Sequence, residues 1–573
     1  MTRLFEEHIR RRVKSLDGAW KFCIDPENCG KQEQWFQGLP NGETVLVPTV
    51  WNSQNQYFTY LGTAWYEKKF YSDGGCLRFC FGAVMTEAEV WLDGKYIGSH
   101  YGGFSQFELI ATNVEKGFHL LTVRVNNEFS EISIPQPLVD WYYHGGIIRS
   151  VSVETLEGIC VLSNRLEYEL AEDLQSLTGK FVLELYNSQK NVDCTSVIIY
   201  VGEEKVYKGV IEVAENSILE VVTPEFQIDH VRLWDVEAPN LYPISILTDT
   251  DDLQDRVGFR KIVVENQKLM LNNKEIELRG VNRHEEHPEC GFAFPPNLMK
   301  RDLDLALDMG CNAIRGSHYP NSQEFVDLLD ENGVLFWSEI EFWGGGFSEE
   351  VLKNPVVAKR GLDMHKEMVK NYYNHPSIII WGMHNEVLSQ TQTAYDLSKL
   401  YYDFLKENGG NRLVVYATNK PLEDICFEFC DVMCMNLYYG WYWDGITAWD
   451  AALEEVLQKR KELGFEDKPI ILSEFGGDAV FGAHDHEDMV GSEEYQAKLI
   501  EYCLKTFHNC PAIVGSFIWQ FCDSRTCRRA GLDRARGFNN KGILNEYRKP
   551  KLAYYAAQRL YQSFANETEN TSS

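Results

Sequence analysis

Two glutamates that follow short apolar runs are the residues of this chain best suited to chemistry. Glu386 follows the run 378–381 and comes directly after Asn385, whereas Glu474 follows the run 470–472 in the tetrapeptide Ser-Glu-Phe-Gly. Hydrolysis of a glycosidic bond needs one carboxyl group to protonate the leaving group and a second to attack or stabilise the anomeric carbon. A retaining enzyme holds them ~5–5.5 Å apart and an inverting one ~6.5–9.5 Å. For either glutamate alone, a structural ion pair at a strand end is the alternative.

The elements that must position these glutamates alternate between strands and helices. Helical stretches are expected at 298–309, 356–373, 393–407 and 493–508. Between and around them lie eight short apolar runs, centred on Leu278, Ile314, Leu335, Ile379, Val415, Cys434, Ile471 and Ile518. This alternation predicts a (β/α)8 barrel over residues 263–573. Because side chains that follow the strands meet at the C-terminal face of such a barrel, strands four and seven bring the two glutamates together.

The first 262 residues read as β-structure without long helices. Alternating runs such as 88–92, followed by Asp93-Gly94, and 120–125, followed by Asn126-Asn127, are typical of hairpins. The composition changes near residue 155, which predicts two β-sandwiches, at 1–155 and 156–262. The chain as a whole is therefore expected to be a multidomain protein of β plus α/β class.

The charge balance restricts the partners of this chain. Lys and Arg total 55 and Asp and Glu total 85, for a net charge of −30. Such a chain repels polyanions, so nucleic acid is not an expected partner, and a site for an acidic ligand must supply its own positive charge. The 15 scattered cysteines, with no apolar signal segment or membrane-spanning run, favour a cytoplasmic protein with free thiols. Aromatic residues, at 13%, suit packing against sugar rings but also suit a large core.

Several motifs together resemble glycoside hydrolase family 2 from end to end. They are SLDGAW at 15–20, VPTVWN at 47–52, GGFSQF at 102–107, RGVNRHE at 279–285, RGSHYP at 315–320 and NHPS at 374–377. The resemblance implies a jelly-roll β-sandwich at 1–155, an immunoglobulin-like β-sandwich at 156–262 and a catalytic TIM barrel at 263–573. It also implies a retaining double displacement, with Glu386 as acid/base and Glu474 as nucleophile.

The implied roles have a physical basis. Two neighbouring carboxylates resist sharing charge, so the pKa of Glu386 should be raised while Glu474 is ionised. Once Glu474 is esterified, the pKa of Glu386 should fall, which lets it act as a base toward water. By the same resemblance, Asn385 is expected to bind the 2-hydroxyl of the sugar.

The tripeptide Asn539-Asn540-Lys541 after the eighth strand bears on which sugar is bound. It matches the Asn-x-Lys signature of β-glucuronidases within the family, and an ammonium with an amide can hold the C6 carboxylate of a uronic acid. The expected partners are small-molecule glucuronides or glucuronate-capped oligosaccharides. Galacturonate differs only at C4, so a β-galacturonidase stays open as an alternative. A β-galactosidase is disfavoured, because Lys541 would then be buried without a carboxylate.

Further substrate-binding residues follow from the resemblance. In the segment 436–442, Asn436 belongs to the site, Tyr438 is expected to orient the nucleophile and Tyr442 to contact the uronate. A core position is the alternative for a tyrosine, and it is preferred for Tyr439. Asp140 is expected to reach the sugar from the jelly-roll domain, while Trp519 should border it.

The sequence leaves the roles of three residues open and makes one prediction about the entrance to the site. His318 either borders the sugar or is a buried histidine at the barrel rim. Neither Arg534 nor Arg536 is assigned, since this stretch departs from the family pattern. The short glycine-rich segment 342–347 lacks a long insertion found in some bacterial relatives, which predicts an open entrance with weak preference for small aryl groups.

Two rival classes and the cofactor question complete the predictions. A metal-dependent hydrolase would use histidines and acids at 284–287 and 484–486, but His-Glu-Glu-His is not a zinc-binding pattern, and no metal is expected. A non-catalytic sugar-binding protein would not need both glutamates. The mechanism requires no cofactor. Some bacterial relatives carry flavin mononucleotide (FMN) away from the active site, and no sequence marker decides this here. Family members usually form dimers or tetramers, so a homo-oligomer is expected.

Overall fold

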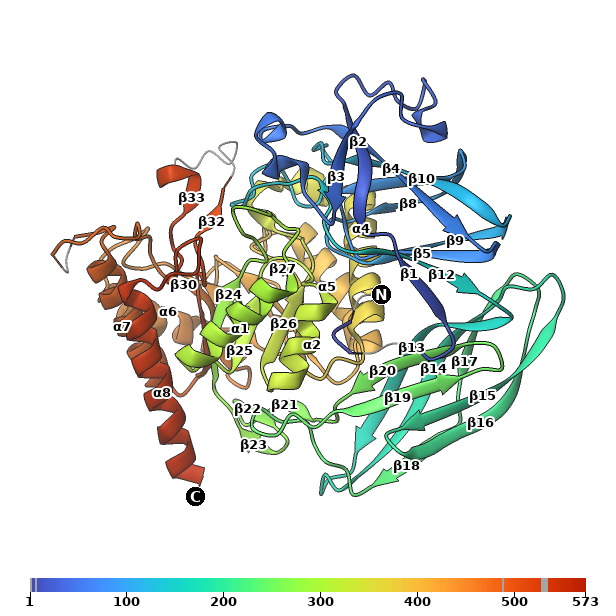
Figure 1. Cartoon of the computed structure of the whole chain (residues 1–573). Coiled ribbons are helices and arrows are strands. Elements are labelled where there is room, and N and C mark those ends of the chain that lie inside the picture. Colours follow the sequence, from blue (N-terminus) through green and yellow to red (C-terminus); the bar gives the residue numbers. More distant parts are fainter. Residues whose placement is uncertain (1–2, 6–7, 487–488, 527–533, 573) are drawn as a thin grey trace.

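The computed structural model describes residues 3–5, 8–486, 489–526 and 534–572 of the chain. Two β-sandwiches precede a closed eight-stranded barrel surrounded by helices (Figure 1). This multidomain β plus α/β architecture confirms the predicted fold class. None of the described helices is long and apolar enough to span a membrane.

The first sandwich packs a four-stranded sheet against a six-stranded sheet. In β10 (Gly117–Asn126) the side chains of Leu121, Val123 and Val125 are fully buried, as expected when alternate residues face the core. The four-stranded sheet contains β1 (Arg12–Ser15), β12 (Val151–Leu156), β5 (Gly75–Phe81) and β9 (Phe107–Val114). The six-stranded sheet contains β3 (Glu43–Val47), β2 (Gly18–Asp25), β4 (Thr63–Ser72), β10 (Gly117–Asn126), β7 (Glu87–Leu92) and β8 (Lys95–Tyr101). A separate pair joins β6 (Val84–Met85) and β11 (Gly146–Ile147).

The two predicted hairpins have different outcomes. Asp93 and Gly94 connect β7 to β8 as predicted, and both have positive φ, as a tight hairpin turn requires. The hairpin expected at Asn126-Asn127 is wrong. The Asn127 side chain instead accepts a hydrogen bond from the Gly62 amide at 2.9 Å, and the chain continues into an irregular segment, 127–145, that runs onto the barrel.

The second sandwich has two antiparallel sheets whose facing side chains form a separate core. One sheet contains β13 (Ile159–Leu170), β14 (Ser176–Asn187), β17 (Ile218–Val222) and β18 (Phe226–Asp229). The other contains β16 (Glu204–Val213), β15 (Asp193–Val201), β19 (Tyr242–Leu247) and β20 (Asp252–Val257). A small sheet of β21 (Ile262–Glu265), β22 (Lys268–Leu271) and β23 (Lys274–Glu275) leads into the barrel. Leu269 and Leu271 of β22 share a buried cluster with Trp337 and Phe517 of the barrel strands.

All eight predicted barrel strands are present in a closed parallel barrel. They are β24 (Leu278–Arg283), β25 (Ala313–Gly316), β26 (Leu335–Glu339), β27 (Ile378–Asn385), β28 (Leu413–Thr418), β29 (Met433–Asn436), β30 (Ile470–Phe475) and β31 (Ile513–Ile518). The helices are α1 (Pro296–Met309), α2 (Gln323–Asn332), α3 (Glu349–Leu352), α4 (Pro355–Tyr372), α5 (Gln392–Asn408), α6 (Ala448–Glu462), α7 (Glu493–His508) and α8 (Leu552–Ser572). A short hairpin of β32 (Ser524–Arg525) and β33 (Phe538–Asn539) follows β31.

The first sandwich is fixed against the barrel by direct contacts. The ring of Phe104 stacks on that of Tyr319 with centroids 3.8 Å apart. The Gly103 amide donates a hydrogen bond to Oε1 of Glu341 at 2.7 Å. This docking allows the segment 127–145 to contribute side chains to a site at the barrel mouth.

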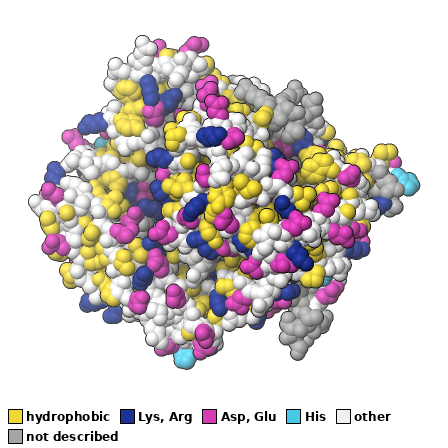
Figure 2. Space-filling view, turned by 180° about the vertical axis from the view of Figure 1, so that it is seen from behind, with side chains coloured by type: hydrophobic (Ala, Val, Ile, Leu, Met, Phe, Trp, Pro, Cys, Tyr) yellow, Lys and Arg dark blue, Asp and Glu magenta, His cyan; other side chains and the backbone are white. Residues whose placement is uncertain are grey.

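On the face of the molecule shown in Figure 2, acidic and basic side chains are interspersed with apolar ones. Every cysteine in the described ranges is a free thiol. Any concentration of positive charge for an acidic ligand must therefore be sought among particular side chains within the fold.

Candidate active site

The two predicted glutamates lie at the C-terminal mouth of the barrel. Glu474 is buried within β30, and its carboxylate accepts hydrogen bonds from the Tyr438 hydroxyl at 2.6 Å and from Arg315 at 3.0 Å. Glu386 follows the last residue of β27 in a left-handed conformation, with φ of 53°. This conformation is uncommon for a non-glycine residue and occurs both in turns and at functional sites.

A chain of hydrogen bonds joins the two carboxyl groups. Asn436 donates to Oε1 of Glu386 at 2.7 Å and to Oδ1 of Asn385 at 3.0 Å. Arg315 donates to the same Asn385 oxygen at 2.8 Å and reaches Glu474 through its other terminal nitrogen. The Asn385 amide nitrogen is buried and has no partner in the described protein. The oxygen of Asn385 is thus held by two donors, while its amide nitrogen donates to no described group of the protein.

The electrostatics distinguish the two glutamates. Burial, followed by the charge of Glu474, raises the pKa of Glu386 to about 8, even though part of its side chain is accessible. The Asn436 hydrogen bond and the Arg315 charge oppose this shift in pKa. A protonated carboxyl beside a carboxylate held by an arginine and a tyrosine suits a general acid beside a nucleophile.

Arg315 and Glu339 are members of the site that the sequence interpretation did not assign. Arg315 is fully buried in β25 and donates two hydrogen bonds to Glu339, at 3.0 and 3.1 Å. Its guanidinium also lies over the Trp337 ring, 4.5 Å from the centroid. The signal was present, because an arginine inside an apolar barrel strand must be buried and needs a carboxylate partner.

Aromatic side chains line another side of the mouth. His318 stacks on Trp519 with centroids 5.0 Å apart, and the Trp141 ring lies 5.9 Å from His318. Burial, with the charge of Arg315, lowers the pKa of His318 to about 3, so the imidazole is neutral. His318 is buried at the barrel mouth and its Nε2 lies 3.7 Å from Oε1 of Glu474, so contact with a sugar stays a prediction for this residue.

The signature residues form a polar cradle close to the glutamates. The Lys541 side chain is 1% exposed, and its ammonium lies 2.9 Å from both the Tyr442 hydroxyl and a carboxylate oxygen of Asp478. Asn539 donates to Asp140 at 2.9 Å, so the aspartate of the first sandwich contacts the signature, while its expected contact with the sugar stays a prediction. Asp478 was not singled out in the sequence, although it lies only four residues after Glu474.

Arg534 adds a second cation to this cradle. It donates to Asp140 at 2.5 Å and lies 3.4 Å from both Asp478 and the Tyr442 hydroxyl. Arg536 instead pairs with Glu546 at 2.8 Å, away from these groups. The structure thus separates two arginines that the sequence did not distinguish.

Some candidates lie elsewhere. Tyr439 is half-buried and packs against Trp449 at the edge of the barrel core. In the first proposed metal-binding stretch, His284 hydrogen-bonds the Tyr319 hydroxyl and Glu285 pairs with Arg149 at 3.0 Å. These contacts engage one ring nitrogen of His284 and one carboxylate oxygen of Glu285, and the described part of this stretch does not bring three ligand atoms within 4.8 Å of one another.

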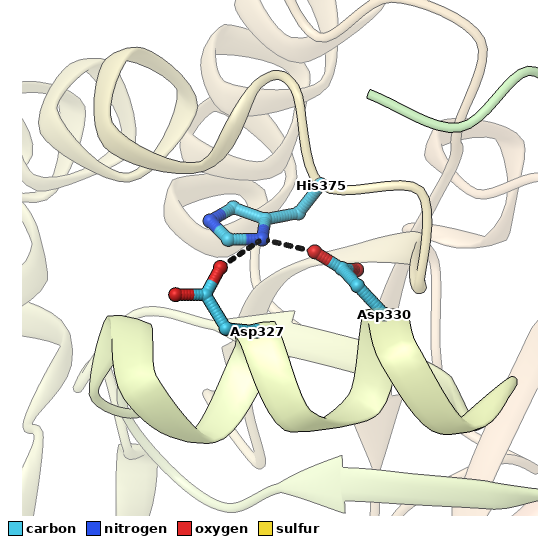
Figure 3. Close-up of side chains that lie close together, drawn as sticks. All are labelled: Asp327, Asp330 and His375. Carbon is cyan, nitrogen blue, oxygen red and sulfur yellow. Dashed lines mark hydrogen bonds and ion pairs between the residues drawn. The ribbon is translucent and has the colours of Figure 1, made fainter. Parts of the chain in front are cut away.

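One cluster in the described ranges does bring three metal-type ligands together (Figure 3). Nδ1 of His375 lies 2.6 Å from Asp330 and 3.9 Å from Asp327. However, Arg3 contacts Asp327 at 2.7 Å and Arg256 does so at 3.3 Å. Protein cations neutralise this cluster, so it is a structural ion-pair network between the N-terminal segment, the second sandwich and α2.

Comparison with known proteins accounts for the whole architecture. Three models of glycosyl hydrolases family 2 match in order: the sugar binding domain at 13–156, a further family domain at 164–260 and the TIM barrel domain at 262–566. A β-glucuronidase of Streptococcus agalactiae is 28% identical over 94% of each chain.

Two solved structures that resemble this chain belong to enzymes with different activities. A family 2 β-galacturonidase from Eisenbergiella tayi, bound to galacturonate, has a TM-score of 0.92 and 32% identity, covering 98% of this chain and 99% of its own. The β-glucuronidase of Ruminococcus gnavus has a TM-score of 0.86 and 27% identity over the same shares of the two chains.

Proposed function

We propose that this chain, which belongs to glycosyl hydrolases family 2 and is a glycoside hydrolase, is a retaining exo-β-glucuronidase. The observation that carries the uronic-acid specificity is the placement of Lys541 and Arg534. Both cations reach the Tyr442 hydroxyl, at 2.9 and 3.4 Å, and both contact Asp478. Asp478 already supplies a carboxylate to Lys541, so the expectation that Lys541 would lack one in a β-galactosidase is wrong. The support for a uronic acid is instead that a C6 carboxylate entering here would meet two cations, Lys541 and Arg534.

The proposed reaction proceeds in two displacements. Glu474 attacks the anomeric carbon while Glu386 gives its proton to the glycosidic oxygen, so the aglycone leaves as an alcohol and a glycosyl ester forms. Arg315 and Tyr438 hold the attacking carboxylate in position. Ionised Glu386 then takes a proton from water, which attacks the same carbon and releases Glu474 and the sugar. Asn385 is placed to bind the 2-hydroxyl with its unpartnered amide nitrogen.

We infer a broad range of aglycones from the short segment 342–347 and the exposure of the entrance. Gly344 in this segment packs tightly on the backbone of Glu386, where an added Cβ would lie 2.2 Å from the carbonyl oxygen, so the segment positions the acid/base candidate and leaves no long loop over it. The side chain of Tyr442 at the mouth is 49% exposed. We therefore propose small glucuronides and glucuronate-capped oligosaccharides as substrates, with similar rates on both.

β-Galacturonidase is the second candidate, and it rests on the Eisenbergiella tayi structure, which resembles this chain at 32% identity. Lys541 and Arg534 can bind either epimer, because glucuronate and galacturonate both carry a carboxylate at C6 and differ only at C4. A neutral β-galactoside offers no anion to these cations.

The test is kcat/KM on three matched aryl β-glycosides: glucuronide, galacturonide and galactoside. Preference for the glucuronide supports the proposal. Preference for the galacturonide replaces it with the second candidate and keeps the role of the cationic cradle. Preference for the galactoside refutes uronic-acid recognition and leaves only the family-level chemistry.

A further inference from the structure

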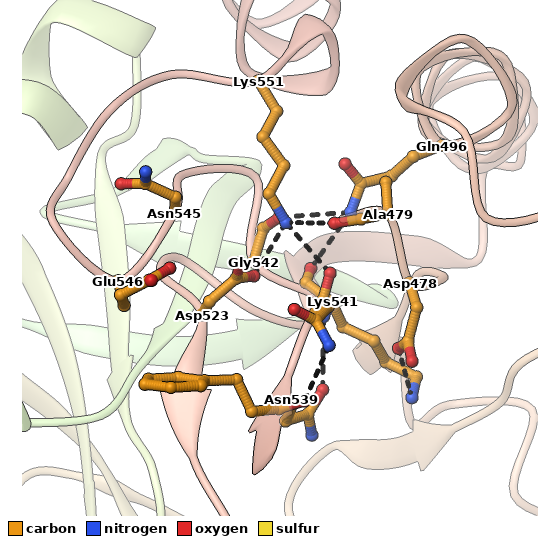
Figure 4. A network of polar contacts seen from close by, with 12 residues as sticks. Asp478, Ala479, Gln496, Asp523, Asn539, Lys541, Gly542, Asn545, Glu546 and Lys551 are labelled. Carbon is orange, nitrogen blue, oxygen red and sulfur yellow. Dashed lines mark hydrogen bonds and ion pairs between the residues drawn. The ribbon is translucent and has the colours of Figure 1, made fainter. Parts of the chain in front are cut away.

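Lys551 is a buried lysine outside the cradle that none of the roles above uses. Its side chain is 0% exposed, as is that of Asp523, and the two pair at 2.7 Å. The same ammonium donates to the backbone oxygens of Ala479 at 2.6 Å and Asn540 at 3.0 Å. Its three protons therefore meet three acceptors on separate segments (Figure 4).

These acceptors belong to the walls of the uronate cradle. Asn540 lies between the two signature residues, Asn539 and Lys541. Ala479 follows Asp478, which pairs with Lys541, and its amide donates to the Asn540 oxygen at 3.0 Å. One ammonium thus joins the loop after β30 to the loop after β31.

Gln496 of α7 makes a second, independent connection between the same loops. Its amide donates to the oxygens of Gly477 at 2.9 Å and Gly542 at 3.1 Å, one on each loop. Its side chain is buried. Since buried carbonyls need donors, removing Lys551 takes the donor from the Ala479 oxygen, and removing Gln496 takes it from those of Gly477 and Gly542. Either change leaves the bond between Ala479 and Asn540 with less support and loosens the connection between the loops.

We infer that Lys551, supported by Gln496, is a positioning residue for uronate recognition. It holds the loops that carry Lys541 and Asp478 at a fixed position relative to each other. This inference rests on the proposed uronosidase function. Lys551 itself is too enclosed to touch the sugar. Its removal should therefore act on carboxylate binding and leave the two glutamates, which lie on β27 and β30, in place.

The test compares Lys551→Met with Lys549→Met, an exposed lysine two positions earlier. Each variant is assayed on an aryl β-glucuronide and on the matching neutral β-glucoside. We expect Lys551→Met to lower kcat/KM on the glucuronide by about 30- to 100-fold, chiefly through KM, because displacing a binding group by about 1 Å has effects of this order. Activity on the glucoside and all rates of Lys549→Met should stay within about twofold of the wild type, the range of an exposed substitution.

Two further variants keep the test decisive if Lys551→Met does not fold. Lys551→Met with Asp523→Leu removes both buried charges, and Gln496→Leu breaks the second connection. Selective loss on the glucuronide in a folded variant supports the inference. An unchanged glucuronide-to-glucoside ratio, or an equal loss on both substrates, overturns it. The wild-type ratio, measured in the same assay, separately decides whether the chain prefers uronosides at all.

Discussion

The side-chain amide of Asn436 donates a 2.7 Å hydrogen bond to the carboxyl group of Glu386. This contact favours the ionised form of Glu386, against burial and the charge of Glu474, which together raise its pKa to about 8. Asn436 is itself held by the Ser473 hydroxyl, which donates to its oxygen at 2.7 Å. Burial and the charge of Glu474 thus raise the pKa of Glu386 while the Asn436 hydrogen bond lowers it. Removing one of these contributions should shift that pKa.

The pH dependence of glycosyl transfer should report this balance. Glu386 must be protonated to act as an acid, so kcat/KM on a substrate with a poor leaving group, such as phenyl β-glucuronide, should fall as pH rises through about 8. In Asn436→Ala the donor is lost, the ionised form is disfavoured, and the alkaline limb should move to higher pH. Tyr439→Phe, a core change, is the control. An alkaline limb in Asn436→Ala that stays in place or moves to lower pH would contradict the assignment.

The roles of the two glutamates can be separated by chemical rescue. Glu474→Ala should lose activity by about 10⁴-fold or more, as expected for a nucleophile, and added azide should restore turnover of an activated aryl glucuronide as the α-glycosyl azide. Glu386→Ala should give the β-glycosyl azide, because azide then attacks the glycosyl-enzyme without needing a base. NMR of the products identifies the anomers. The same anomer from both variants would refute the double displacement as proposed.

The spacing of apolar runs along the sequence was sufficient to predict the barrel strands. It was not sufficient to predict the contacts of the site, because these join residues that are far apart in the sequence. Each apolar run marked one buried parallel strand, which fixed where Glu386 and Glu474 project. The contact between Asp140 and Asn539 spans 399 positions and depends on how the first sandwich docks. The sequence could not distinguish Arg534 from Arg536. The two arginines flank Ala535 in a tight turn, and the backbone conformation of that turn determines which side chain faces the cradle.

Carboxylate recognition should depend on Lys541. Lys541→Met removes the buried ammonium, 2.9 Å from Asp478, that would also pair with the substrate carboxylate. Losing one partner of a buried pair costs about 3–5 kcal/mol, or roughly 10²- to 4 × 10³-fold. We expect this loss in kcat/KM on the glucuronide, with neutral glycosides unchanged or improved. Lys549→Met provides the matched control. An equal loss on charged and neutral substrates would show that Lys541 supports the fold rather than the carboxylate.

A last prediction concerns the docking of the first sandwich on the barrel. Burial raises the pKa of Glu341 to about 8, from an ordinary value of 4.5, while Oε1 accepts the Gly103 amide and Oε2 has no hydrogen-bond partner. The folded chain thus binds a proton that the unfolded chain releases above about pH 4.5. The stability linked to this group is complete below that pH and is lost as pH rises through about 8.

Glu341→Gln should therefore melt at a higher temperature than the wild type at pH 8–9, with the difference shrinking toward pH 4.5. The neutral amide keeps an oxygen for Gly103 and cannot ionise, so it avoids the cost of a buried charge. Thermal unfolding across this pH range checks the expectation, with exposed Glu350→Gln as the control. A melting difference that is independent of pH would mean that Glu341 does not titrate in this window. A variant less stable than the wild type at pH 9 would show that the carboxylate is held charged at the interface.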